Sequence, residues 1–402
     1  MKYVPIPIAL LEVGKPLPVD VLSSTGQLLL RRGHPIATQQ DRERLYAFAA
    51  CTTELEGLAW QRAYERKVHD MLRSGAPLEE IARASMPEAL RDSDFVVSQQ
   101  PQGSWLDLQE VLRGILYQGG LAVSPLARLA GLQDRAMVLL EQDADHSLFC
   151  LFQALADDSL GYCATHALLC AVVAELSARI LGFDAPQRRV LFAAALTMNI
   201  GMARAQDSLA RQQGALSAEQ RTLVARHGAL GAELLQSLGQ DDTDVLDLVR
   251  WHHTPDAPQA LAHTARARRL LHLADAFVAR VAARKTRAAQ SALRAVKSMV
   301  IDAPGEDLGM GSAMAQAVGF YPPGSYVELL NGEAAVAVQR GARANTPWVI
   351  SLADKDGVPI ARYVCRDTAQ TAYTLRGALS ADRVKVVVHA DKVAQARARL
   401  AA

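Results

Sequence analysis

The apolar residues in the middle of the chain recur at helical spacing. Between about residues 124 and 319, leucine, alanine, valine and methionine return every three or four positions, which is the period of an amphipathic helix. Residues 187–198 are apolar on nearly every face, and a helix of that kind is expected at the centre of a domain. Strands do not alternate with these helices, which argues against a parallel sheet.

Capping and breaking residues divide this region into separate helices. Pro125 follows Ser124 as a first-turn proline behind a cap, and Gly182 is placed to end a helix over residues 162–180. Ser217 and Gln220 have the spacing of a capping box that opens another helix. We expect further helices near residues 107–117, 230–238, 244–252, 264–285, 289–301 and 308–318.

The first part of the chain predicts a small β-rich module. Residues 18–22 and 27–33 form two short apolar runs with a glycine-containing turn between them, which is typical of paired strands. Thr38 is placed to cap a helix that follows. Residues 86–104 combine proline, glycine, serine and glutamine, as linkers and exposed loops do.

The last part of the chain also predicts strands. Asn331-Gly332 lies between two alternating runs, and this dipeptide is a strong signal for a hairpin. Residues 348–352 and 358–364 flank a polar, glycine-containing stretch and predict a second hairpin. Residues 391–402 return to a helical pattern.

These patterns predict a mainly α protein, a helical bundle with small β-rich modules at its N- and C-terminal ends. A chain of 402 residues is too long for one ordinary core. We expect four regions: a β-rich module at 1–57, a helical and linker region at 58–123, the helical domain at 124–319 and a β-hairpin and helix appendage at 320–402.

The composition is typical of a soluble globular protein. Half of the residues are hydrophobic and the net charge is +1, so no strong field attracts nucleic acid or an anionic membrane. The five cysteines lack C-x-x-C spacing, which indicates a reducing compartment. No signal-peptide pattern and no uninterrupted apolar run of membrane-spanning length occurs. We expect a cytoplasmic protein without nucleic-acid or membrane partners, and a homo-oligomer stays open.

Four histidines and one aspartate of the helical domain are the candidate metal ligands: His166, His227, His252, His253 and Asp275. In this order and spacing they resemble the HD superfamily of metal-dependent phosphohydrolases, and within it the bacterial HD-GYP branch, which hydrolyses cyclic di-GMP. The matching segments are 165–167, 226–235, 249–253 and 273–277, with 321–325, 331–333, 17–20 and 28–33 resembling the end of the family's domain and an accompanying module.

The resemblance breaks down at the His-Asp pair that names the family. Ile200 and Gly201 mark the register, and in that register Met198 stands in place of the histidine and Asn199 in place of the aspartate. The lysine that would follow is Met202, and the Gly-Tyr-Pro segment expected after the paired histidines is missing. A thioether is a soft ligand that suits iron, manganese or magnesium poorly, and an amide offers only a neutral oxygen.

The lost aspartate changes which metals the site can hold. In the family its carboxylate bridges two metal ions, whereas here Asp275 is the one anionic ligand carried over. Two divalent ions would therefore be poorly neutralised. The resemblance leaves two alternatives: one divalent transition metal, iron or manganese, or no metal. We expect no intact catalytic residues and a residual metal site.

Two further groups of residues are candidates for binding. Arg284 and Arg287 stand where the family has phosphate-contacting arginines, and guanidinium groups suit phosphate oxygens. The alternative for these arginines is a solvated basic helix end. Cys163, His166 and Cys170 share one helix face, but buried cysteines more commonly behave as small hydrophobic residues.

Two functional hypotheses follow from the resemblance. The first is a catalytically inactive HD-GYP-like signalling protein that senses a cyclic di-GMP-related ligand or regulates a protein partner. The second is an active metal-dependent phosphodiesterase that uses a reduced site of His227, His252, His253 and Asp275. Metal-assisted hydrolysis needs a cation that lowers the pKa of its bound water, so protein that binds no transition metal would rule against the second hypothesis.

Overall fold

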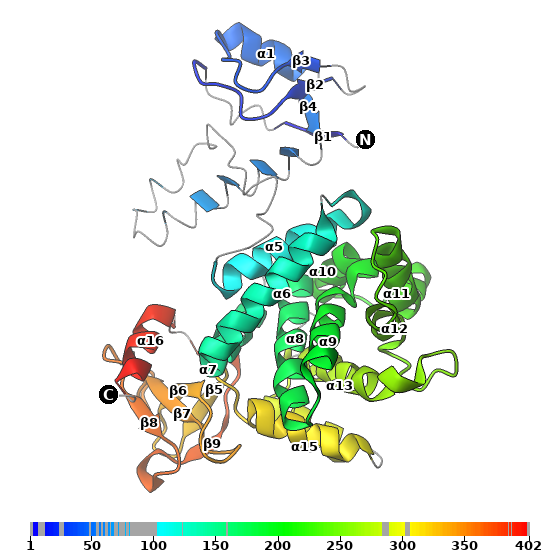
Figure 1. The fold of residues 1–402 in the computed structure, drawn as a ribbon. Coiled ribbons are helices and arrows are strands. Elements are labelled where there is room, and N and C mark those ends of the chain that lie inside the picture. The colour runs from blue at the N-terminus through cyan, green and yellow to red at the C-terminus, as the bar shows by residue number, and fades with distance from the viewer. Residues whose placement is uncertain are drawn as a thin grey trace. The chain divides into compact units, whose positions relative to one another are not determined.

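The computed structural model describes residues 103–399 except 123, 158–159, 284–288, 302–305, 385 and 387, together with 3–6, 13–23, 28–47, 50–53 and scattered residues between 56 and 80. Its contacts divide the chain into two units, Met1–Ser98 and Gln99–Ala402 (Figure 1). The finer boundaries expected within these units stay predictions.

The first unit is built on a small antiparallel sheet. The predicted hairpin is confirmed as β2 (Val21–Leu22) and β3 (Leu28–Leu30). Two strands that the sequence did not predict, β1 (Tyr3–Pro5) and β4 (Cys51–Thr53), complete the order β1-β4-β2-β3. Helix α1 (Gln39–Ala47) begins behind Thr38, whose hydroxyl accepts the backbone N–H of Asp41 at 3.1 Å.

The second unit consists mostly of helices, as predicted. Residues 103–318, where described, form α5 (Trp105–Gln118), α6 (Pro125–Gln142), α7 (Ala144–Leu155), α8 (Tyr162–Ile180), α9 (Ala185–Thr197), α10 (Ala203–Arg211), α11 (Ala218–Ser237), α12 (Thr243–Trp251), α13 (Ala265–Val281), α14 (Ala292–Ile301) and α15 (Glu306–Val318). A 3-10 turn, η3 (Ile200–Met202), joins α9 to α10.

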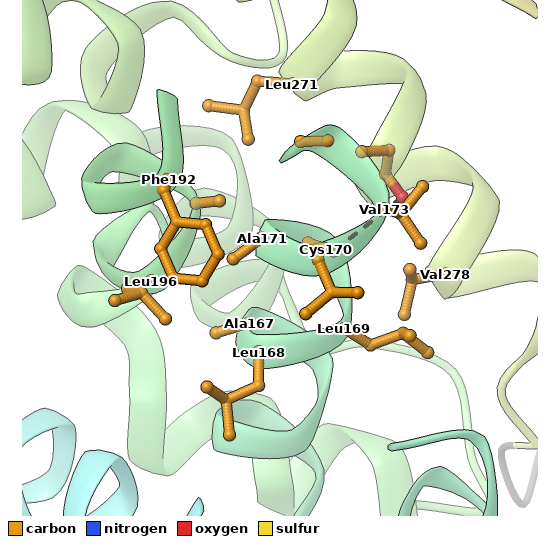
Figure 2. Packing of buried hydrophobic residues seen from close by; sticks show 14 of the residues in the cluster. Ala167, Leu168, Leu169, Cys170, Ala171, Val173, Phe192, Leu196, Leu271 and Val278 are labelled. Atoms are coloured by element: carbon orange, nitrogen blue, oxygen red, sulfur yellow. Dashed lines mark hydrogen bonds between the residues drawn. The ribbon is translucent and has the colours of Figure 1, made fainter. Parts of the chain in front are cut away.

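Helix α8 lies at the centre of this unit. It contacts α7, α9, α13 and α15, and Figure 2 shows its apolar side chains between Phe192 and Leu196 of α9 and Val278 of α13. Among the described helices, α8 is long and apolar enough to cross a membrane. However, 89% of its apolar 18-residue window is buried inside the unit. This burial is typical of a helix in the core of a folded unit.

Several helix predictions need correction. The expected central helix, α9, is buried only from Leu191 onwards, because its first turns carry polar residues that face solvent. The helix expected at 230–238 is the second half of α11, which continues through Gly228 and Gly231. Helix α13 ends at Val281 rather than near residue 285. Helices α7 and α10 were not predicted at all.

The chain then forms a five-stranded antiparallel sheet in the order β8-β7-β6-β5-β9. The Asn331-Gly332 hairpin is confirmed as β5 (Tyr326–Leu329) and β6 (Ala334–Gln339). The remaining elements are β7 (Trp348–Ala353), β8 (Cys365–Asp367), β9 (Leu375–Ala378) and α16 (Ala390–Ala398).

The second predicted hairpin is wrong in its return strand. Within residues 358–364 only Pro359 forms a bridge, to Ala353, and the next strand along the chain that pairs with β7 is β8. A proline has no N–H to give to a ladder, so the chain pairs again only beyond it. Strand β9 was missed because it pairs with β5, far away in the sequence.

A candidate metal centre between three helices

Glycines bring the histidine-bearing segments into close contact. A Cβ added at Gly228 of α11 would lie 2.8 Å from the carbonyl oxygen of Arg250 on α12. A Cβ added at Gly201 of η3 would lie 2.4 Å from the carbonyl oxygen of His227. Real Cβ atoms do not approach backbone so closely, so only glycine lets η3, α11 and α12 pack together here. This packing sets His227 opposite His252.

His227 and His252 face each other through their Nε2 atoms, which lie 3.1 Å apart. Each ring donates its Nδ1–H to a backbone carbonyl three residues earlier, Val224 at 2.6 Å and Val249 at 2.8 Å. Since a carbonyl can only accept, both Nδ1 atoms carry the proton. A neutral imidazole has one N–H, so two Nε2 lone pairs point at each other. Such a pair is stabilised by a cation that both nitrogens share.

His253 completes a cluster of three imidazoles. Its ring centroid lies 4.9 Å from that of His227 and 4.2 Å from that of His252. One ligand nitrogen from each of the three lies within 4.8 Å of the others. His227 and His252 are buried, whereas the side chain of His253 is 48% exposed. A metal ion held here would therefore have two buried ligands and one on the solvent side.

Burial keeps these imidazoles neutral. Desolvation is the main cause that lowers the pKa of His252 to about 3. Burial also lowers the pKa values of His227 and His253. A proton therefore does not occupy the space between the two Nε2 atoms near neutral pH. Neutral imidazole is the form that binds metal ions.

His166 and Asp275 form a second group, joined by a hydrogen bond. His166 Nε2 donates to Asp275 Oδ1 at 2.7 Å, and its Nδ1 lies 3.0 Å from the Tyr162 hydroxyl. Burial raises the pKa of Asp275, but the hydrogen bond and charge of His166, with His252 and His253, outweigh burial, and the net pKa is well below its ordinary value. The carboxylate is ionised, and His166 orients it.

Asp275 links the two groups. Its Oδ2 lies 3.9 Å from Nδ1 of His253, while its Oδ1 is held by His166. Cys170 also approaches His166, with Sγ 3.4 Å from Nε2. Burial and then Asp275 raise the pKa of this thiol well above its usual value, so it is no ready thiolate ligand. The five predicted residues thus lie together, but only the three-imidazole cluster presents free nitrogen lone pairs.

The comparison with protein families agrees with this constellation. The family model described as HD domain matches residues 150–304, a stretch that contains all five residues. The chain carries an HD domain. No curated protein matches the sequence. Among solved structures, the chain is similar to Bd1817, a HDG"Y"P protein from Bdellovibrio bacteriovorus, with 16% identity, 78% of this chain and 99% of that chain covered, and a TM-score of 0.40.

Met198 and Asn199, the residues predicted to stand in place of the family's His-Asp pair, lie at the end of α9. Met198 is fully buried and belongs to the hydrophobic core. Asn199 is buried, and its Nδ2 has no hydrogen-bond partner within the described part of the chain. Neither the Asn199 amide, which is neutral, nor the buried Met198 thioether can replace a carboxylate that bridges two metal ions. The donor set of the HD domain therefore fits one metal ion at the three imidazoles and does not fit two.

Two side-chain groups beside the cluster were not found from the sequence. His272 of α13 donates Nδ1–H to the His252 carbonyl at 2.9 Å. Asp247 of α12 accepts from Thr264 Oγ1 at 2.6 Å and from Arg268 Nη1 at 2.5 Å. Arg268 also donates to the Pro255 carbonyl at 2.9 Å and so holds the segment after His253. For His272 the usable signal was its place one helical turn before Asp275. The partners of Asp247 gave no local signal.

Arg284 and Arg287, the predicted phosphate-binding residues, lie outside the described residues. Their role stays a prediction.

Proposed function

We propose that this chain is a degenerate HD-GYP-like signalling protein without hydrolytic activity, whose HD domain binds a ligand or partner. The observation that carries the proposal is the end of α9. Met198 packs in the core and Asn199 supplies a neutral amide where the family has its His-Asp pair. Without that bridging carboxylate, two divalent ions in a largely buried site would lack charge compensation.

The metal that we propose is a single divalent transition metal, iron or manganese. His227, His252 and His253 would hold it, because their ligand atoms already lie together. Asp275 is close enough to His253 to add a negative charge. A bound ion would supply Lewis acidity to a water or a phosphoryl oxygen. The chain's own contribution is to fix the rings through the Val224 and Val249 carbonyls.

The ligand class that we propose is cyclic di-GMP or a related phosphodiester, with a protein partner downstream. The HD-domain match and the resemblance of the surrounding segments to HD-GYP proteins support this class. We also propose a cytoplasmic location, because none of the five cysteines forms a disulfide.

The decisive experiment combines calorimetric titration with cyclic di-GMP and a hydrolysis assay in the presence of added iron or manganese. We expect binding without hydrolysis. Hydrolysis that His252→Ala abolishes would refute the proposal. As a gain-of-function arm, Met198→His combined with Asn199→Asp should raise the metal content per chain above that of the unaltered protein, and the Met198→His single change should not.

An active phosphodiesterase with one metal is the second candidate function. The observation that favours it is the half-exposed ring of His253 beside two buried imidazoles and an ionised Asp275, which leaves one side of the site open to a substrate. Protein prepared in excess iron or manganese that retains no metal by elemental analysis would eliminate this alternative.

A further inference from the structure

A cavity lies away from the histidines, where α14 and α15 meet the C-terminal sheet. It has a volume of about 710 Å³, within the range of small-molecule sites. Its walls come from α14, α15, the start of α7 and the connection between β6 and β7. None of the candidate metal ligands lines it.

The cavity wall carries more positive than negative charge. Its charged side chains are Asp145, Lys297, Arg340 and Arg343. Arg340 Nε donates to Asp145 Oδ1 at 2.6 Å, and its Nη1 donates to the Ala317 carbonyl at 2.7 Å. This pair is therefore internally neutral and ties β6 to α7 and α15. Lys297 and Arg343 remain as the surplus charges.

The charged side chains of Lys297 and Arg343 are both exposed. In the part of the chain that the structure describes, neither side chain has an ion-pair or hydrogen-bond partner. Two uncompensated cations that line the same cavity attract an anion, which charge-assisted hydrogen bonds can hold.

The segment that carries Arg343 is fixed in place. A Cβ at Gly341 would lie 1.7 Å from the Thr346 carbonyl oxygen, so this turn closes only on a glycine. Thr346 donates its backbone N–H to the Arg343 carbonyl at 3.1 Å, and Phe320 donates to the Ala344 carbonyl at 2.8 Å. Arg343 is thus presented by a preorganised turn, which lowers the entropy cost of binding.

The rest of the wall suits an aromatic ring with polar substituents. Phe320 and Tyr321 contribute half-buried aromatic surface. Ser312 and Gln316 are exposed one turn apart on α15 and offer a hydroxyl and an amide. An aromatic face beside cations and hydrogen-bonding groups is the chemistry that holds nucleotides.

We propose that this cavity is a binding site for an organic phosphate that carries an aromatic ring, such as a mononucleotide. Lys297 and Arg343 hold the phosphate, Phe320 and Tyr321 contact the ring, and the Arg340–Asp145 pair maintains the wall. The site is separate from the candidate metal centre and does not depend on a metal ion there.

Calorimetry with AMP, adenosine and inorganic phosphate on the full chain tests this site. We expect AMP to bind more tightly than either fragment, and Lys297→Ala or Arg343→Ala to weaken AMP binding roughly tenfold each, as loss of a charge-assisted phosphate contact does. Raising the salt concentration should weaken binding further.

The matched controls are Arg294→Ala on α14 and Arg362→Ala, two exposed cations that do not line the cavity. Both should leave AMP affinity within a factor of two of the unaltered protein. The proposal is overturned if AMP does not bind, if adenosine or phosphate binds as tightly as AMP, or if the control substitutions weaken binding as much as the cavity substitutions. Circular dichroism of each variant separates lost binding from lost folding.

Discussion

Helix α12 holds two buried polar clusters that differ in how completely their atoms are paired. Asp247, in the middle of the helix, accepts three hydrogen bonds from Leu261, Thr264 and Arg268. His252, just past its end, places an unshared Nε2 lone pair opposite that of His227. A buried network whose polar atoms all have hydrogen-bond partners stabilises the fold. Two buried acceptor atoms that face each other without a donor are instead preorganised to bind a ligand. The first cluster is therefore tested by its effect on stability, and the second by its response to metal ions.

The largest effect is expected from breaking the paired cluster. Arg268→Met leaves the Asp247 carboxylate buried without its cation, which costs about 3–5 kcal/mol of unfolding free energy. Urea denaturation followed by circular dichroism measures it. The double variant with Asp247→Leu should recover much of the loss, because no unpaired charge remains. A single-variant loss below about 1 kcal/mol would show that the pair is not essential to folding.

The unsatisfied pair should respond to metal instead. Manganese or ferrous iron at a hundred times its Kd should stabilise the protein by about 2.7 kcal/mol, seen as a rise in the thermal midpoint. His227→Ala and His252→Ala should abolish this rise. Arg362→Ala, an exposed change in the C-terminal region, should retain it. A rise that survives both histidine substitutions would locate the metal elsewhere.

The close contact of α11 with α12 links folding to the site. Gly228→Ala adds a Cβ at 2.8 Å from the Arg250 carbonyl, and we expect a loss of about 2 kcal/mol in unfolding free energy together with weaker metal uptake. Gly309→Ala in α15 is the control, because no atom lies within 4 Å of its added Cβ. This second change should be neutral or stabilise the helix by up to about 1 kcal/mol. Equal destabilisation by both variants would contradict the packing argument.

The smallest effect is a dependence of stability on pH. Burial lowers the pKa of His252 to about 3 in the folded protein, against about 6.5 in the unfolded chain. Below pH 6.5 the unfolded state takes up a proton that the folded state does not, so metal-free stability falls as pH decreases, by up to about 1.4 kcal/mol per pH unit. Denaturation at pH 7 and pH 5 measures the slope. His252→Ala should flatten it, and an unchanged slope would assign the dependence to other groups.

Local signals fixed many of the elements in advance. The predicted helix over residues 162–180 is α8 to the residue, and the capping box of Ser217 and Gln220 opens α11. The Asn331-Gly332 hairpin forms as expected. Strand β9 escaped prediction because its partner, β5, lies far away in the sequence. Strand β8 was missed because Pro359 interrupts the run from which the return strand was expected.

The sequence alone predicted the candidate ligands and the two positions that depart from the family pattern. The histidines, Asp275 and the Met198-Asn199 replacement are all visible as residue types at fixed spacing. Only the tertiary structure decided which of these side chains contact each other. His166 pairs with Asp275, 109 positions further along the chain, and His227 faces His252, 25 positions further along. Spacing along a chain fixes the face of a helix, but the crossing of helices at glycines fixes which faces meet.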